Sequence, residues 1–196
     1  DISFSIDLVQ LALNHLEFLE FIDYQRIFYN SDLVKCAAYK YEKYWLPFYA
    51  KQIENGKNPA NFYPSYDVAW IWHCHLLSPV DYRRDCKNLF NRVLDHFCFN
   101  RQEIELKQKY TKDLWEKTLG VSFFDSEYDK NFTTKLGYDL ISSSERQKNF
   151  YYNVSLPHFR SKNFLQLCLE RYKKFLFVKQ TFPDMFVVPC YGIDII

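Results

Sequence analysis

With 196 residues, 48% of them hydrophobic and 20% aromatic, the chain can form a packed core, which excludes an intrinsically disordered segment. The formal net charge is +1, from 25 Lys and Arg against 24 Asp and Glu, so no overall field attracts nucleic acid or an anionic membrane. No apolar run approaches the roughly 18 to 20 residues that cross a bilayer, and no signal-peptide pattern is visible. We therefore expect an intracellular, cytoplasmic protein with no membrane partner.

Apolar residues spaced three or four positions apart predict helices in the first half of the chain. The first covers residues 6–21 and the second residues 33–52, which Pro47 is expected to kink or end. Turn-forming residues predict an exposed loop over 55–61, followed by an extended approach over 62–66. The sequence then predicts a third helix over residues 67–77.

A sharp corner is expected after the third helix. Ser78 has the residue type of an N-cap and Pro79 that of a first helical position, so a fourth helix is predicted over residues 79–92. An amphipathic helix follows over residues 101–119 and ends at Gly120.

The last third of the chain contains two further predicted helices. Residues 121–142 have no clear period and are expected to form a connecting loop. A helix over residues 143–154 is stopped by Pro157, and a long helix covers residues 162–180. The predicted fold class is all-α, mostly helical.

Six cysteines, an even number, would permit three disulfides. Most lie inside apolar helical patterns of a chain that is large enough to fold without covalent cross-links, so we expect reduced thiols. These cysteines are Cys36, Cys74, Cys86, Cys98, Cys168 and Cys190.

Two short segments of the sequence repeat one another. Residues 64–71 (PSYDVAWI) and 189–196 (PCYGIDII) match at proline, tyrosine and two apolar positions, and each follows an aromatic, basic helix end. The sequence therefore predicts two divergent helical repeats, each with a short extended segment before its Pro-x-Tyr turn. The predicted boundaries are residues 1–120 for the first repeat, 121–142 for the connecting loop and 143–196 for an incomplete second repeat.

The segment DVAWIWHCHLLSPVDYRRDC, residues 67–86, resembles the tryptophan-histidine-x-histidine segment of the glycine-rich domain-containing protein-like (GRDP-like) family. Residues 150–159 and 171–176 are similar to two further landmarks of that family, in the same order. In the family a second such segment follows the second Pro-x-Tyr turn, whereas this sequence stops at Ile196, so we expect a fragment. The plant relatives carry a glycine-rich tail and a proposed RNA-binding motif, and the developmental and stress roles that the resemblance implies transfer only loosely.

The candidate functional residues all belong to that segment. His73, His75 and Cys86 are of the types that bind zinc. Residues two positions apart on a helix are separated by about 200° of rotation. His73 and His75 would therefore face nearly opposite sides of a helix and could not share one ion unless the helix unwound. Cys86 could still approach either Cys74 or His75 across the corner at Ser78 and Pro79. The full candidate set is Asp67, Trp72, His73, His75, Pro79, Tyr82, Asp85 and Cys86.

A structural role for the same segment is the competing interpretation. Trp70, Cys74 and Leu77 would then fill the core, and each histidine would donate one ring hydrogen to a carbonyl or carboxylate. Trp72 is expected to be buried, although Trp70, Ile71 and Trp72 cannot all face inward on one helix.

The two acidic residues of the segment also have a structural interpretation. Asp67 is expected to be a cap or first-turn carboxylate of the third helix. Asp85 is expected to pair with Arg83 or Arg84.

Known catalytic signatures are absent: there is no HExxH, glycine-rich phosphate loop, nucleophile elbow or CxxC. We therefore assign no catalytic residue and no cofactor. The first hypothesis is a non-enzymatic protein-interaction or scaffold domain of a larger protein, with an unknown protein partner. One alternative is a zinc-type enzyme or sensor centred on His73, His75 and Cys86. The other is an accessory part of an RNA-binding protein, although nucleic acid is an unlikely ligand for this fragment itself.

Overall fold

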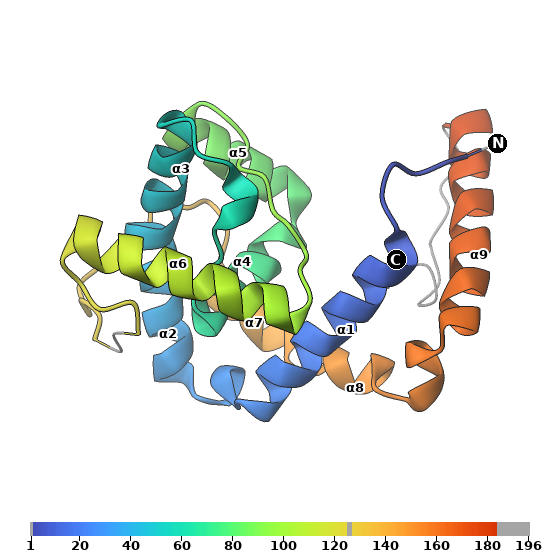
Figure 1. The fold of residues 1–196 in the computed structure, drawn as a ribbon, viewed down its shortest axis with the longest axis horizontal. Helices are drawn as coiled ribbons and strands as arrows, with labels where there is room; N and C mark the ends of the chain where they lie inside the picture. The colour runs from blue at the N-terminus through green and yellow to red at the C-terminus, as the bar shows by residue number, and fades with distance from the viewer. Residues whose placement is uncertain (1, 125–126, 184–196) are drawn as a thin grey trace. The chain divides into compact units, whose positions relative to one another are not determined.

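The fold is all-α in the part of the chain that the computed structural model describes, residues 2–124 and 127–183 (Figure 1). These residues form no strand, so the predicted fold class is confirmed. Short 3-10 turns cover Ile27–Tyr29, Pro59–Asn61 and Pro157–Arg160, and a π-helical turn covers Tyr41–Trp45. The α-helices are α1 (Leu8–Tyr24), α2 (Ser31–Lys40), α3 (Leu46–Glu54), α4 (Tyr66–Leu76), α5 (Pro79–Phe90), α6 (Arg101–Leu119), α7 (Leu140–Gln147), α8 (Phe150–Val154) and α9 (Lys162–Thr181).

Most helices lie close to their predicted ends. The helix α6 has its predicted bounds, and Gly120 ends it with a positive φ of 67°. None of the described helices is long and apolar enough to span a membrane. The second Pro-x-Tyr turn at residues 189–191, with Cys190, lies outside the described residues.

Contacts divide the chain into two compact units, which we describe separately. The larger comprises Phe21–Phe97 and Arg101–Asn149, and the smaller comprises Asp1–Glu20, Cys98–Asn100 and Phe150–Ile196. This division follows spatial contacts, whereas the predicted repeats concern sequence similarity. The repeat boundaries therefore stay a prediction.

The smaller unit is built from most of α1, up to Glu20, together with α8 and α9. Leu16, Val154 and Leu165, one from each of these helices, are buried. The ring of Phe4, which precedes α1, stacks on Tyr172 of α9 with 5.8 Å between ring centroids. Apolar packing therefore holds this unit together.

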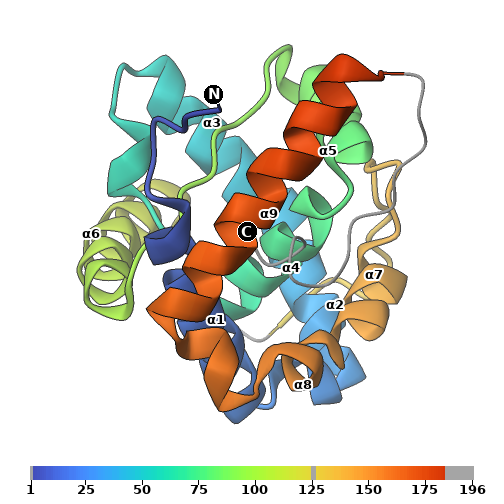
Figure 2. The same cartoon turned by 90° about the vertical axis from the view of Figure 1, so that its right-hand side faces the viewer.

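Helix α4 is the central element of the larger unit, where it packs against α2, α5 and α7 (Figures 1 and 2). Trp70, Ile71 and Trp72 are each at most 2% exposed. The prediction that these three side chains cannot all face inward is therefore wrong. Neighbouring helices cover most of the circumference of α4, which leaves Asp67, His73 and Leu76 only partly exposed, and a helix that is hydrophobic on most sides is typical of such a position. Leu77, which was expected in the core, is 48% exposed because it lies just beyond the covered part.

The second predicted helix continues past Pro47 with a local change of pitch. In the π-helical turn that follows α2, the N–H of Leu46 donates to the carbonyl of Tyr41, five residues back. Pro47 then occupies the first turn of α3. Proline lacks an N–H and its ring crowds the preceding turn, so a wider turn before it relieves the conflict. Pro47 therefore does not end the helical stretch.

The predicted helix over residues 143–154 is wrong in two respects. Helix α7 begins at Leu140, because the side chain of Asp139 caps it by accepting from the Ser142 N–H at 3.0 Å. It ends at Gln147, and α8 is a separate helix. Ser143 and Ser144, expected at the helix start, are instead buried against α4.

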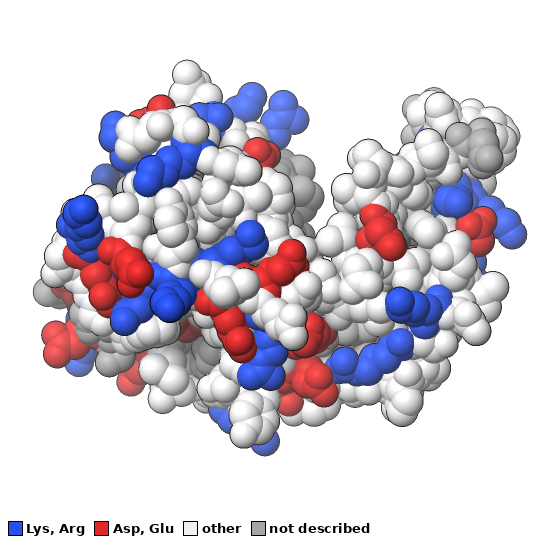
Figure 3. Space-filling view, in the orientation of Figure 1, with Lys and Arg blue, Asp and Glu red and all other residues white. Residues whose placement is uncertain are grey.

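The larger unit exposes charges of both signs. On the face shown in Figure 3, Lys and Arg side chains are interspersed with Asp and Glu. This mixture agrees with a formal net charge of +1 for the whole chain. The visible face therefore offers no extended basic surface of the kind that binds a nucleic-acid backbone.

Candidate functional site

The corner between α4 and α5 is held by side chains of α5 itself. Ser78 occupies the N-cap position, but its hydroxyl makes no bond to a backbone N–H and donates instead to the carboxylate of Asp81. The predicted side-chain cap is therefore wrong, whereas Pro79 does occupy the first helical position. Arg84 Nη1 lies 2.7 Å from Asp81 Oδ1. The hydrogen bond from Ser78, with the Arg84 charge beside it, lowers the pKa of Asp81.

His75 lies at the centre of the larger unit and is fully buried. Its Nδ1 is 3.0 Å from the hydroxyl oxygen of Tyr41, and its Nε2 is 3.4 Å from Asp85 Oδ2, a contact that falls short of hydrogen-bond geometry. Tyr138 stacks on the imidazole with an interplanar angle of 5°, and Tyr82 approaches it edge-on. Tyr41, Asp85, Tyr138 and Tyr82 therefore surround the buried imidazole.

Burial sets the protonation of this cluster. It lowers the pKa of His75 to about 4, against the opposing effect of Asp85, so the imidazole is neutral at pH 7. A carboxylate only accepts hydrogen bonds, so we assign the single ring proton to Nε2, and Nδ1 then accepts from the Tyr41 hydroxyl. Burial also raises the pKa of Tyr41 well above 10, which keeps that hydroxyl a donor.

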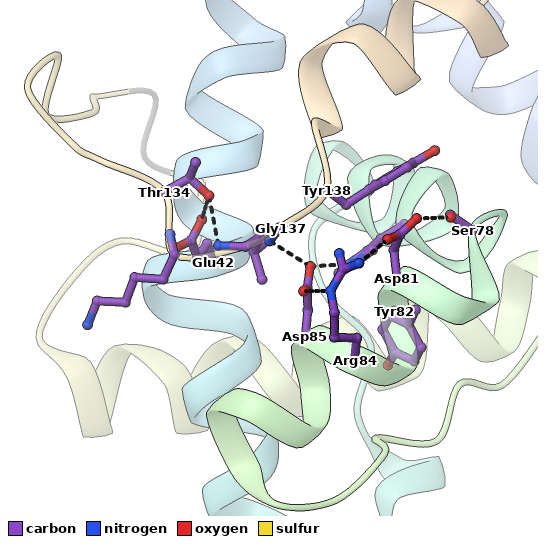
Figure 4. A network of polar contacts seen from close by, with 12 residues as sticks. Glu42, Ser78, Asp81, Tyr82, Arg84, Asp85, Thr134, Gly137 and Tyr138 are labelled. Atoms are coloured by element: carbon purple, nitrogen blue, oxygen red, sulfur yellow. Dashed lines mark hydrogen bonds and ion pairs between the residues drawn. The ribbon is translucent and has the colours of Figure 1, made fainter.

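Asp85 links the corner to a distant segment of the chain. It is 3% exposed, and its Oδ1 lies 3.2 Å from Arg84 Nε, which is one of the two predicted pairings. Its Oδ2 accepts from the N–H of Gly137 at 3.0 Å (Figure 4). One buried carboxylate thus binds Arg84 and the backbone at Gly137 and lies beside His75.

Gly137 is required by this close approach and not by its backbone angles. A Cβ at this position would lie 2.6 Å from Arg84 Nη2 and 3.2 Å from Asp85 Oδ1. Such distances force a neighbour to move, and Arg84 is held in place by two carboxylates. A larger residue here would therefore have to displace the Arg84 guanidinium from these carboxylates.

Glu42 provides a second buried anchor, from the π-helical turn. Its carboxylate accepts from Thr134 Oγ1 at 2.6 Å and from the Lys135 N–H at 2.5 Å (Figure 4). The Thr134 hydroxyl oxygen in turn accepts from the Leu136 N–H. Residues 134–138, which we call the wall segment, are therefore held by two carboxylates, Glu42 and Asp85. Sequence reasoning missed Glu42. The signal that could have found it is the position of a carboxylate between Tyr41 and Trp45, inside an apolar pattern, which indicates a buried charge that needs hydrogen-bond partners.

Trp72, Tyr82 and Cys86 form the other side of the corner. Trp72 is buried as predicted, and its Nε1 donates to the Tyr82 hydroxyl at 3.1 Å. That hydroxyl donates to the Leu94 carbonyl at 2.8 Å. Burial raises the pKa values of Tyr82 and Cys86, so both groups remain protonated at neutral pH. These residues stabilise the corner through packing and hydrogen bonds.

The remaining candidates lie apart from this cluster. Asp67 is a first-turn carboxylate of α4, as expected, and it pairs at 2.6 Å with the buried ammonium of Lys40. His73 is half-buried, and its ring lies 5.5 Å from that of Trp70.

The histidine–cysteine set was the sequence-based candidate for zinc. In residues 2–124 and 127–183, no three His, Cys, Asp or Glu side chains are grouped so that they could hold a metal ion. The described cysteines, which are Cys36, Cys74, Cys86, Cys98 and Cys168, are free thiols.

An open groove of about 590 Å³ lies beside the wall segment. The wall segment forms one side of it, and α2 forms another, with aromatic, aliphatic and charged side chains in the lining. The lining residues are Lys35, Ala38, Tyr39, Glu42, Tyr128, Asp129, Lys130, Phe132, Thr134, Leu136, Gly137, Tyr138, Asp139, Leu140 and Ile141.

Comparisons with known proteins agree on one relationship. The family model described as "Glycine-rich domain-containing protein-like" matches residues 2–85 and 81–196, two consecutive segments as a repeat would produce. Glycine-rich domain-containing protein 1 of Arabidopsis thaliana is 35% identical over 212 residues, which cover 100% of this chain and 26% of that protein. Glycine-rich domain-containing protein 2 is 32% identical over 209 residues, covering 100% and 27%. The chain thus spans about a quarter of the length of these relatives, and no solved structure matches it significantly.

Proposed function

The chain belongs to the glycine-rich domain-containing protein-like family, and we propose that it is a non-enzymatic protein-interaction module of a larger protein. The observation that carries this proposal is the pair of buried carboxylates, Glu42 and Asp85, that hold the wall segment of an open groove. The histidine-containing corner therefore acts through Asp85 on the shape of a surface groove.

Burial argues against a catalytic role for the corner. His75 and Cys86 are at most 1% exposed, so a substrate in solution cannot reach them. The pKa of the Cys86 thiol is raised by burial, whereas a reactive cysteine needs a lowered one. The burial of His75 and Cys86 therefore supports a structural role for these two residues.

The groove has the properties of a preformed binding site. Its lining combines Tyr39, Tyr128 and Phe132 with a few charged groups, and one side is fixed by hydrogen bonds to buried carboxylates. Binding sites are commonly concave, mostly apolar and formed before the ligand arrives, which lowers the entropy lost on association.

A selection from a display library of random heptapeptides tests this proposal. We expect peptides that bind the wild-type chain and lose at least tenfold in affinity on Ile141→Arg, which places a long charged side chain in the groove lining. The matched control is Leu106→Arg on α6, where an exposed leucine outside the groove receives the same change. Selected peptides that bind both variants equally well would count against the groove as the interaction site.

A further inference from the structure

We propose that the groove binds a partner peptide by the cationic side chain of an arginine or lysine. This inference rests on the proposed interaction function and names the chemistry of the partner. Three features of the groove lining support it: the aromatic rings, the hydrogen-bonding groups of the wall segment and the carboxylates.

The aromatic rings form one part of the groove. Phe132 meets Tyr39 at 87° with 4.9 Å between centroids, and Tyr128 lies 6.5 Å from Tyr39 at 51°. All three side chains are half-buried and line the groove, so part of each ring remains accessible. Because the face of an aromatic ring carries partial negative charge, it attracts an ammonium or guanidinium group.

The backbone of the wall segment offers acceptors. The N–H groups of Lys135, Leu136 and Gly137 already donate to Glu42, Thr134 and Asp85. By contrast, the carbonyl oxygens of residues 134–137 accept no hydrogen bond from any residue that the structure describes. The complementary ligand is rich in donors: guanidinium has five N–H donors, ammonium has three, and neither has an acceptor.

The charges of the lining favour a cation. The lining contains three carboxylates, on Glu42, Asp129 and Asp139, and two ammonium groups, on Lys35 and Lys130. The ammonium of Lys35 lies 3.6 Å from the carboxylate of Asp32, which is not a lining residue. The hydrogen bond from Ser142 lowers the pKa of Asp139, so that carboxylate is charged at neutral pH. Lys130 is exposed, and its flexible side chain can keep its ammonium in solvent.

The test uses the heptapeptides selected against the wild-type chain. We expect arginine or lysine at one position of the groove-dependent peptides, and at least a tenfold loss of affinity when methionine replaces it. The double variant Asp129→Asn/Asp139→Asn should weaken binding of these peptides about three- to tenfold and flatten its salt dependence. Asparagine can still accept from Asn131 N–H and cap α7, so the turn and the helix start are preserved.

Two matched comparisons exclude indirect effects. Asp113→Asn/Glu54→Gln removes two exposed carboxylates outside the groove and should leave affinity unchanged. Tyr128→Leu keeps apolar area but removes a ring, so it should weaken the arginine peptide more than its methionine version.

The outcomes separate this inference from the proposed function. Groove-dependent peptides without a basic residue, or with equal affinity for the double variant, overturn the cationic specificity and leave the interaction module standing. If no selected peptide depends on the groove, both proposals fail.

Discussion

Helix α4 and the wall segment are held in place by different forces. Helix α4 is covered on most sides, with Trp70, Ile71 and Trp72 buried, so apolar packing stabilises it. The wall segment has no regular secondary structure, and its backbone N–H groups depend on Glu42 and Asp85. A packed helix has a sequence pattern of its own, whereas a segment held by distant carboxylates does not. The two regions should also fail differently when they are perturbed.

The largest effect is expected from Trp72→Ala in the packed helix. Deleting a buried indole leaves a cavity and removes the donor to Tyr82, so we expect a loss of about 3–5 kcal/mol in the free energy of unfolding. Reversible chemical denaturation measures this loss. Leu77→Ala, at a position that is 48% exposed, serves as the control and should cost less than about 1 kcal/mol.

Asp85→Ala should produce a smaller global loss together with a local opening. Removing the carboxylate leaves Arg84 and the Gly137 N–H without this partner, and we expect a cost of about 3 kcal/mol. Amide exchange at Gly137 should also accelerate more than exchange within α4. Uniform acceleration in both regions would show that the wall segment is not a separate hydrogen-bonded element.

Gly137→Ala tests the close approach between the wall segment and the corner. The added Cβ would lie 2.6 Å from Arg84 Nη2, so we expect a loss of about 1–3 kcal/mol. Combining it with Arg84→Ala removes the clash, and the two changes should therefore be non-additive in a double-mutant cycle. Additive losses of unfolding free energy would mean that the cost of Gly137→Ala does not come from a clash with the Arg84 side chain.

Acidification should weaken the packed region through His75. Burial lowers the pKa of this residue to about 4, below the value of about 6.5 for an ordinary histidine. Between these values the unfolded chain binds a proton that the folded chain does not, so stability falls as the pH drops from 6.5 toward 4.

The pH dependence of His75→Gln provides the measurement. His15 also has a pKa lowered to about 4 by burial, so the difference between wild type and variant isolates His75. Between pH 6.5 and 4, the free energy of unfolding of the wild type should fall more steeply than that of the variant, by about 1 kcal/mol per pH unit. Parallel stability curves for the two proteins would contradict a buried neutral imidazole.

Ser78→Ala should have the smallest effect. The hydroxyl binds Asp81 instead of capping the backbone, so we expect a loss of about 0.5 kcal/mol, at the low end for a hydrogen bond. The pKa of Asp81 should rise in the variant, because this hydrogen bond is the main cause of its lowering. An NMR titration of Asp81 that shows no rise would restore the capping interpretation.

The candidate site was predictable only in part. Trp72, His75, Tyr82 and Asp85 were selected from the sequence, and the structure places these four around one corner. Their shared role in holding a groove was not predictable, because the partners are far away in sequence. Asp85 and Gly137 are 52 residues apart, and Glu42 and Lys135 are 93 residues apart.

The all-α class, most of the helices and the burial of Trp72 could be predicted from the sequence alone, because the periodicity of apolar residues and the turn-forming residues are local signals. The burial of α4 on most of its sides and the accommodation of Pro47 by a π-helical turn follow instead from tertiary contacts. The tertiary structure also decided which backbone groups Glu42 and Asp85 bind. The physical reason is that a buried polar group needs a partner, and the chain's path through space, not its local sequence, selects which one.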